Sequence, residues 1–186
     1  MCALWGSTAK VHHGLMTDFV TAPTHVSARG LPVIDHLGYL CRIPIEGSAT
    51  GGAFSLVEER GRLGCMSPRH LHDREAETFI VLDGALEGWC EGETQLVEAG
   101  GVLHLPARRE HAFRVASDVA HFYILINPAG FESFFEATGR PVEQSFDSDP
   151  PIPGPVPPEA VAALQEILTP LGCTITGPPP FALPGA

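Results

Sequence analysis

Between Gly64 and Gly84 the chain places imidazoles and a carboxylate at a spacing suited to metal binding. His70 and His72 are two residues apart, and Glu77 follows five residues after the second histidine. Side chains two apart on a strand leave the same face, so one strand can direct both imidazoles at one ion. A four-residue turn would then bring the carboxylate to the pair across a hairpin. Nitrogen and oxygen ligands of this kind suit Fe, Ni, Co, Mn, Cu or Zn.

A third nitrogen ligand must come from elsewhere, and His111 is the candidate because it opens the apolar run "HAFRVA" after the turn-like "PARRE". His104, in "GGVLHLP", could line the same pocket. Cys65 lies close to the motif, but a free cysteine commonly packs as a small hydrophobe, and we expect that here. In "DREAE" we expect Glu75 to face water and Glu77 to point inward. Surface or satisfied core positions are expected for His12, His13, His25, His36 and His121.

The strands that carry these ligands also predict the lining of a pocket. If the ligands point inward, alternation along their strands directs Phe79, Val81 and Phe113 inward as well. Phe54 and Trp89 are further candidates for substrate contact. An apolar, aromatic cavity beside a metal would accept a flat phenolic ring system. The same residues could equally be barrel core.

Short apolar runs recur between turn signals and favour an all-β domain. The chain has 186 residues with 20 Gly and 18 Pro, which indicates many turns and few long helices. Asp83-Gly84 between two runs is a hairpin signal, typical of antiparallel strands in a sandwich or barrel. The length suits one domain.

Two short helices are expected after the strands. "GFESFFEATG" places Phe131, Phe134 and Phe135 at helical spacing, and "PPEAVAALQEILTPLG" carries a second apolar stripe. We therefore expect an N-terminal arm over 1–30, a barrel with its following short helix over 31–140, and a Pro-rich linker with a C-terminal helix packed on the barrel over 141–186.

Composition argues against several classes of function. The net charge is -11, and no Lys or Arg run offers a footprint for nucleic acid. No apolar run approaches the roughly 20 residues that span a bilayer, and the N-terminus lacks a signal-peptide pattern. Five scattered cysteines without a Cys-x-x-Cys pair indicate reduced thiols. We expect a cytoplasmic protein that binds neither nucleic acid nor membrane.

The metal-binding stretch resembles the cupin family. The first cupin motif is matched at every fixed position, as Gly64-x5-His70-x-His72-x4-Glu77-x6-Gly84. The second motif is matched more loosely, with Gly100, Pro106 and His111 in register, although Arg108 stands where many cupins have Gly and Val115 where many have Asn. This departure alters a turn and one residue that would pack around the ligands, but the ligand histidine itself is retained.

More narrowly, the chain is similar to single-domain bacterial quercetin 2,3-dioxygenase-like cupins over roughly residues 36–180. The similarity extends to Pro68, to "GFESFFEATGRP" and to the late helix followed by "GPPP". It implies an all-β cupin jelly roll, also called a double-stranded β-helix, and one divalent transition metal held by His70, His72, Glu77 and His111.

The resemblance implies a dioxygenase that cleaves a flavonol or a related polyphenol or polyketide with O2, releasing carbon monoxide. Glu77 would act as a ligand and as the acceptor of the substrate's hydroxyl proton. Single barrels of this family usually pair, so a homodimer is expected. The alternatives are a non-redox cyclase or isomerase of polyketide tailoring, in which the metal polarises a carbonyl, and a non-catalytic small-molecule-binding cupin.

Overall fold

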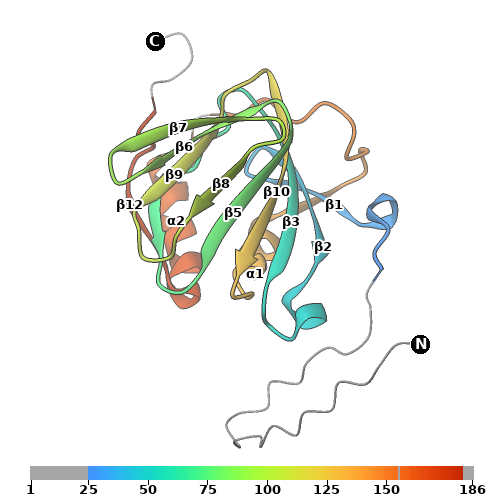
Figure 1. The fold of residues 1–186 in the computed structure, drawn as a ribbon, viewed down its shortest axis with the longest axis horizontal. Coiled ribbons are helices and arrows are strands. Elements are labelled where there is room, and N and C mark those ends of the chain that lie inside the picture. Colours follow the sequence, from blue (N-terminus) through green and yellow to red (C-terminus); the bar gives the residue numbers. More distant parts are fainter. Residues whose placement is uncertain (1–24, 155, 182–186) are drawn as a thin grey trace, which may run out of the picture.

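The computed structural model describes residues 25–154 and 156–181, so most of the expected N-terminal arm, with His12 and His13, lies outside it. Its strands form two antiparallel sheets that face each other (Figure 1). The first sheet has seven described strands in the order β11 (Arg140–Val142), β1 (Val33–His36), β2 (Tyr39–Ile45), β3 (Ser55–Arg62), β10 (Val119–Asn127), β5 (Ala76–Asp83) and β8 (Val102–Leu105).

The second sheet has five described strands. Their order is β12 (Cys173–Gly177), β4 (Arg69–His72), β9 (His111–Val115), β6 (Ala85–Cys90) and β7 (Glu93–Glu98). Consecutive strands often change sheet, as β4 and β5 do, which is the connectivity of a jelly roll. The all-β prediction is confirmed.

The turn at Asp83-Gly84 is not the hairpin that the sequence predicts. β5 and β6 flank it but belong to different sheets, so this turn carries the chain across the barrel. Gly84 has φ +73°, and a Cβ there would collide with the carbonyl of Val119. The hairpin lies further on, where Glu91 and Gly92 both have positive φ between the paired strands β6 and β7. A turn signal fixes a local reversal but not the sheet that the next strand joins.

Both predicted helices are present, as α1 (Glu132–Thr138) and α2 (Pro158–Leu168). α1 buries Phe134 and Phe135, and α2 begins with Pro158 in its first turn and buries Leu168 near its end. Three short 3₁₀ helices complete the described elements, η1 (Ala28–Gly30), η2 (Gly47–Thr50) and η3 (Thr169–Leu171). None of the described helices combines the length and apolar character needed to cross a bilayer.

Two edge strands, β11 and β12, are not predicted by the sequence analysis. β11 lies at the start of the predicted Pro-rich linker and pairs with β1, and β12 pairs with β4. In Figure 1, β12 and α2 lie together at one side of the barrel. β12 therefore covers the outer edge of the strand that carries His70 and His72.

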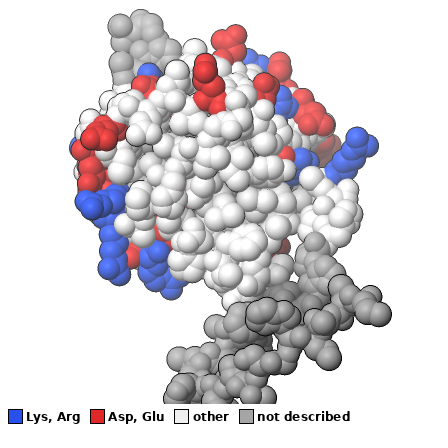
Figure 2. Space-filling model, in the orientation of Figure 1, with Lys and Arg blue, Asp and Glu red and all other residues white. Residues whose placement is uncertain are grey.

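The core fills the space between the sheets. β5 buries alternate residues, among them Phe79 and Val81, and β9 buries Phe113, so the predicted inward parity is confirmed. Apolar side chains of β10, including Phe122 and Ile124, join them from the same sheet as β5. Charged side chains mostly surround the rim of the face in Figure 2, whose centre is largely uncharged.

A buried ion network ties β2, β3 and β10 together on the outer face of the first sheet. The Glu58 carboxylate accepts hydrogen bonds from Arg42 Nε at 2.6 Å and from His121 Nε2 at 2.8 Å, and the side chain is almost wholly buried. Burial raises the pKa of Glu58, but the hydrogen bonds from His121 and Arg42 outweigh it and lower the pKa to about 2. The ionised carboxylate therefore stabilises the folded protein.

We expect Glu58→Gln to lower the free energy of unfolding at pH 7 by about 1–3 kcal/mol, because charge-assisted hydrogen bonds are lost in a buried place. The folded pKa lies below its ordinary value of 4.5, so the stabilisation is fully present above pH 4.5 and is lost as pH falls towards 2. Urea unfolding at pH 7 and pH 3 would measure this. The difference in unfolding free energy between the variant and the unchanged protein should be smaller at pH 3 than at pH 7. The exposed Glu98→Gln variant should match the unchanged protein at both pH values.

Candidate metal centre

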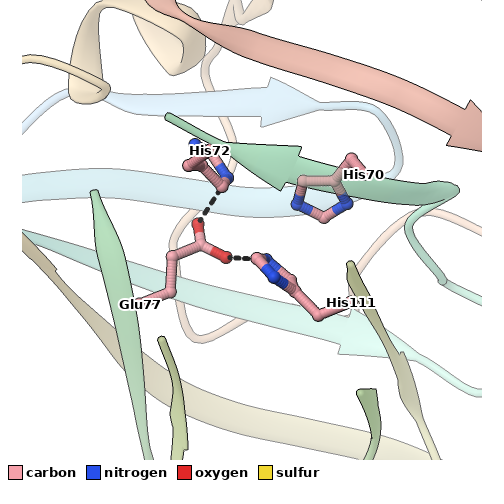
Figure 3. Close-up of side chains that lie close together, drawn as sticks. All are labelled: His70, His72, Glu77 and His111. Atoms are coloured by element: carbon pink, nitrogen blue, oxygen red, sulfur yellow. Dashed lines mark ion pairs between the residues drawn. The ribbon is translucent and has the colours of Figure 1, made fainter. Parts of the chain in front are cut away.

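Four side chains that sequence analysis nominates as ligands converge inside the barrel. β4 carries His70 and His72, and β9 places His111 directly opposite His70 in the antiparallel register. Glu77 comes from β5 in the other sheet. One ligand atom from each residue lies within 4.8 Å of the others, and all four side chains are buried (Figure 3).

The route by which Glu77 reaches the histidines differs from the prediction. β4 and β5 follow one another in the sequence but do not pair, so the carboxylate does not meet the imidazoles across a hairpin. It faces them across the interior, from the opposite sheet (Figure 3). The cluster therefore depends on the packing of the two sheets and not on one local turn.

Backbone carbonyls orient two of the imidazole rings. His70 Nδ1 lies 2.9 Å from the carbonyl oxygen of Pro68, and His111 Nδ1 lies 2.8 Å from that of Arg109. A carbonyl only accepts, so each Nδ1 carries the proton and donates it. The lone pair of each ring is left on Nε2, which is the arrangement by which proteins fix metal-binding histidines.

A second carboxylate, that of Glu75, is buried near His72, contrary to the expectation that it faces water. Glu75 is 1% exposed, and its Oε2 lies 4.0 Å from His72 Nδ1. Arg74 Nη2 donates to the other carboxylate oxygen at 2.9 Å. Glu75 and Glu77 are two residues apart, and this parity is the sequence signal that would have placed both on the inner side.

The cluster leaves several buried polar atoms without a hydrogen bond. They are both ring nitrogens of His72, Nε2 of His111 and Oε2 of Glu77. His111 Nε2 lies 3.3 Å from Glu77 Oε2, and His72 Nε2 lies 3.9 Å from Glu77 Oε1, at ion-pair distance but without hydrogen-bond geometry (Figure 3). Buried polar atoms are costly unless they are satisfied. A cation bound between them would satisfy one nitrogen of His72, Nε2 of His111 and Oε2 of Glu77 together.

The protonation states also suit a cation. Burial lowers the pKa of His70 to about 3, helped by the neighbouring His111, and burial lowers the pKa of His72. Burial alone would raise the pKa of Glu77, but the contact with His111 and the nearby His72 hold it at about 2. Neutral His70 and His72 and the ionised Glu77 are donors of the kind that divalent transition metals accept. These residues fit the metal that the cupin resemblance implies.

A cavity of about 100 Å³ adjoins the cluster, and His70 and Glu77 form part of its wall. Its lining is mainly apolar and includes Phe113. α1 and the residue before it add the three rings that sequence analysis placed at helical spacing, Phe131, Phe134 and Phe135. The centroid of the Phe131 ring lies 4.2 Å from that of His72.

Other residues nominated from the sequence lie elsewhere. Phe79 and Val81 are buried in the core and do not line this cavity, and neither do Phe54 and Trp89, so their contact with substrate stays a prediction. His104 is exposed, and its Nδ1 lies 2.9 Å from the Thr78 hydroxyl. Cys65 packs in the core, as expected, and its thiol lies 3.6 Å from the carbonyl of Gly38. The four described cysteines outside residues 1–24 are free, namely Cys41, Cys65, Cys90 and Cys173.

Comparison with known sequences gives two matches of different extent. A family model described as "Cupin domain" matches residues 63–126, the stretch that contains all four clustered residues. Quercetin 2,3-dioxygenase from Bacillus subtilis (strain 168) is 33% identical over 104 residues, which make up 56% of this chain. The match spans 31% of that longer protein.

Solved structures show the same fold at low sequence identity. KdgF from Halomonas sp. aligns with a TM-score of 0.53 at 19% identity, covering 59% of this chain and 99% of that one. An RmlC-like cupin from Shewanella frigidimarina aligns with a TM-score of 0.51 at 16% identity, covering 60% and 96% of the two chains. Fold, motif and sequence match agree: the chain carries a cupin domain over residues 63–126 and resembles quercetinase-like proteins.

Proposed function

We propose that this protein is a metal-dependent dioxygenase that cleaves a flavonol, or a related polyphenol or polyketide, with O2. The observation that carries the proposal is the buried cluster of three imidazoles and one carboxylate that opens on an apolar, aromatic-lined cavity. His70, His72, Glu77 and His111 would hold one divalent transition metal. When bound, such a metal supplies Lewis-acid and redox chemistry for the reaction of a phenolate with oxygen.

The cavity presents an aromatic wall to a flat molecule that approaches the cluster. Phe113 lines it from β9, and Phe131, Phe134 and Phe135 contribute from α1 and the segment before it. These rings exclude water and pack on aromatic faces. A substrate held there presents its polar edge to His70 and Glu77, which share the same wall.

Glu77 is the group placed to receive a proton from the substrate. It is 4% exposed and ionised, because its pKa is held at about 2. A carboxylate with so low a pKa takes a proton only from a hydroxyl that is itself made acidic. A divalent cation held by the cluster would supply the Lewis acidity that makes the hydroxyl beside the ketone of a flavonol acidic. The similarity to the Bacillus enzyme supports this substrate class.

Removal of one ligand should abolish tight metal binding. We expect His72→Ala to weaken Mn²⁺ or Zn²⁺ affinity by more than about 100-fold, since loss of a supporting partner alone costs about 10–100-fold. Titration calorimetry and metal analysis of the purified proteins would measure this. His104→Ala is the matched control, because that histidine is exposed and outside the cluster. Equal metal content in both variants would contradict the ligand assignment.

Oxygen-dependent cleavage of a flavonol is the direct test of function. The metal-loaded protein is mixed with quercetin without oxygen, and oxygen is then admitted. We expect the flavonol absorbance to disappear only after oxygen is added, with release of carbon monoxide. No bleaching and no carbon monoxide from fully loaded protein would reject the proposal. Turnover of a substrate that continues without oxygen would instead support a cyclase or isomerase.

Substitution of the acidic ligand separates proton transfer from metal binding. Glu77→Gln keeps a ligand oxygen but cannot take up the hydroxyl proton, so we expect kcat to fall about 100- to 10,000-fold with metal still bound. Stopped-flow kinetics together with metal analysis would show this. Glu93→Gln, on the exposed strand β7, should behave as the unchanged protein. Unchanged turnover in the Glu77 variant would remove the carboxylate from the reaction.

A further inference from the structure

A second polar group faces the cavity apart from the metal cluster. His36, Tyr39 and Glu59 all line it, and they come from β1, β2 and β3 of the first sheet. Their exposed fractions are 5%, 5% and 1%. None of them belongs to the four-residue cluster. A buried carboxylate is costly, and its presence in an otherwise apolar wall requires an explanation.

The sheet register brings the three side chains to one face. Leu37 and Gly38 have φ of 53° and 92° and form a two-residue turn, so His36 and Tyr39 are direct cross-strand partners. Glu59 lies opposite Cys41, two residues beyond Tyr39, and so shares that face. Their grouping is a consequence of the hairpin and of its pairing with β3.

The histidine ring is fixed so that one nitrogen remains for a ligand. His36 Nδ1 lies 3.2 Å from Glu59 Oε1, and the carboxylate accepts the Nδ1 proton. The rings of Phe134 and Phe135 pack against the imidazole, with centroids 5.2 and 4.6 Å away. His36 Nε2 is left buried without a hydrogen-bond partner. His36 is therefore a core residue outside the metal cluster, as predicted, but only one of its ring nitrogens has a partner.

Tyr39 shows the same lack of a partner. Its hydroxyl is buried and makes no hydrogen bond, and its ring packs near Phe113 and Phe122. Burial raises the pKa of Tyr39 well above its ordinary value, so the phenol stays neutral and can both donate and accept. A ligand hydroxyl could donate to His36 Nε2 and accept from Tyr39 Oη. An apolar ligand would leave both atoms unpaired.

We propose that His36, Tyr39 and Glu59 form a hydroxyl-binding subsite that selects aromatic substrates bearing a second hydroxyl, remote from the oxygens that approach the metal cluster. The inference rests on the proposed function for the identity of the substrate as a phenolic compound. His36 and Tyr39 contact that hydroxyl, and Glu59 is a positioning residue that fixes the histidine ring. The cavity reaches both this subsite and the cluster residues His70 and Glu77.

The test compares pairs of probes that differ in hydroxylation. Zinc-loaded full-length protein is titrated without oxygen against quercetin and 3-hydroxyflavone, which lacks the remote hydroxyls, and against 4-methylphenol and toluene. We expect the unchanged protein to prefer the hydroxylated member of each pair. Tyr39→Phe removes only an unpaired hydroxyl, so it should fold normally and bind quercetin and 4-methylphenol about 3- to 10-fold more weakly, with no change for 3-hydroxyflavone or toluene.

Two further variants separate binding from structure. Tyr123→Phe is the matched control, because Tyr123 is the other tyrosine of the chain and does not line the cavity. The double variant His36→Phe with Glu59→Leu replaces the polar pair with apolar groups, which costs little stability if both partners go together. We expect it to retain its thermal midpoint and its zinc, and to lose the preference for hydroxylated probes.

The outcomes distinguish this inference from the proposed function. If neither flavonol binds but the preference for 4-methylphenol depends on Tyr39, the flavonol assignment fails and the subsite stands. If the unchanged protein shows no preference for hydroxylated probes, or binds none of the four, the subsite is refuted. A preference that survives in both Tyr39→Phe and the double variant refutes it as well.

Discussion

The main constraint on this structure is that polar atoms of the candidate metal ligands are buried without a hydrogen-bond partner. His72, His111 and Glu77 each bury a polar atom that makes no hydrogen bond. Such a cluster destabilises a fold unless another interaction compensates for it. A bound cation would satisfy one such atom of each residue at once, which would couple affinity for metal to the stability of the barrel. The carbonyls of Pro68 and Arg109 orient two of the imidazoles.

The two sheets contribute unequally to the site. The second sheet supplies the three imidazoles from adjacent strands β4 and β9, where antiparallel pairing sets their relative positions. The first sheet supplies the carboxylate, and it also supplies the separate polar group of His36, Tyr39 and Glu59. The cavity lies between these contributions, and α1 adds its aromatic rings. Packing of one sheet on the other therefore sets both the positions of the four candidate ligands and the size of the cavity.

The interior of the barrel contains two groups of buried polar side chains, and we expect them to contact different parts of a ligand. The cluster concentrates lone pairs and a negative charge where a cation can neutralise them. The internal hydrogen bond of the His36 and Glu59 pair offsets part of the desolvation cost, and His36 Nε2 is left without a partner. Burial raises the pKa of Glu59, while the bond to His36 opposes the rise. An aromatic ligand that carries polar groups at two places would match this distribution.

The sequence by itself determined the strand class, both short helices and the four clustered residues. Periods of two residues in a strand and about 3.6 in a helix are local properties that can be read from spacing. It did not determine which strands share a sheet. The Asp83-Gly84 turn crosses between sheets, Glu77 meets the histidines from the opposite side, and β12 joins β4 from a distant part of the chain. The two-residue spacing of Glu75 and Glu77 indicated that both face inward, but the charged residues around them favoured a solvent-exposed interpretation. The grouping of His36, Tyr39 and Glu59 could be seen only in the tertiary structure. Pairing between distant strands is decided by the packing of the whole barrel, and no short segment encodes it.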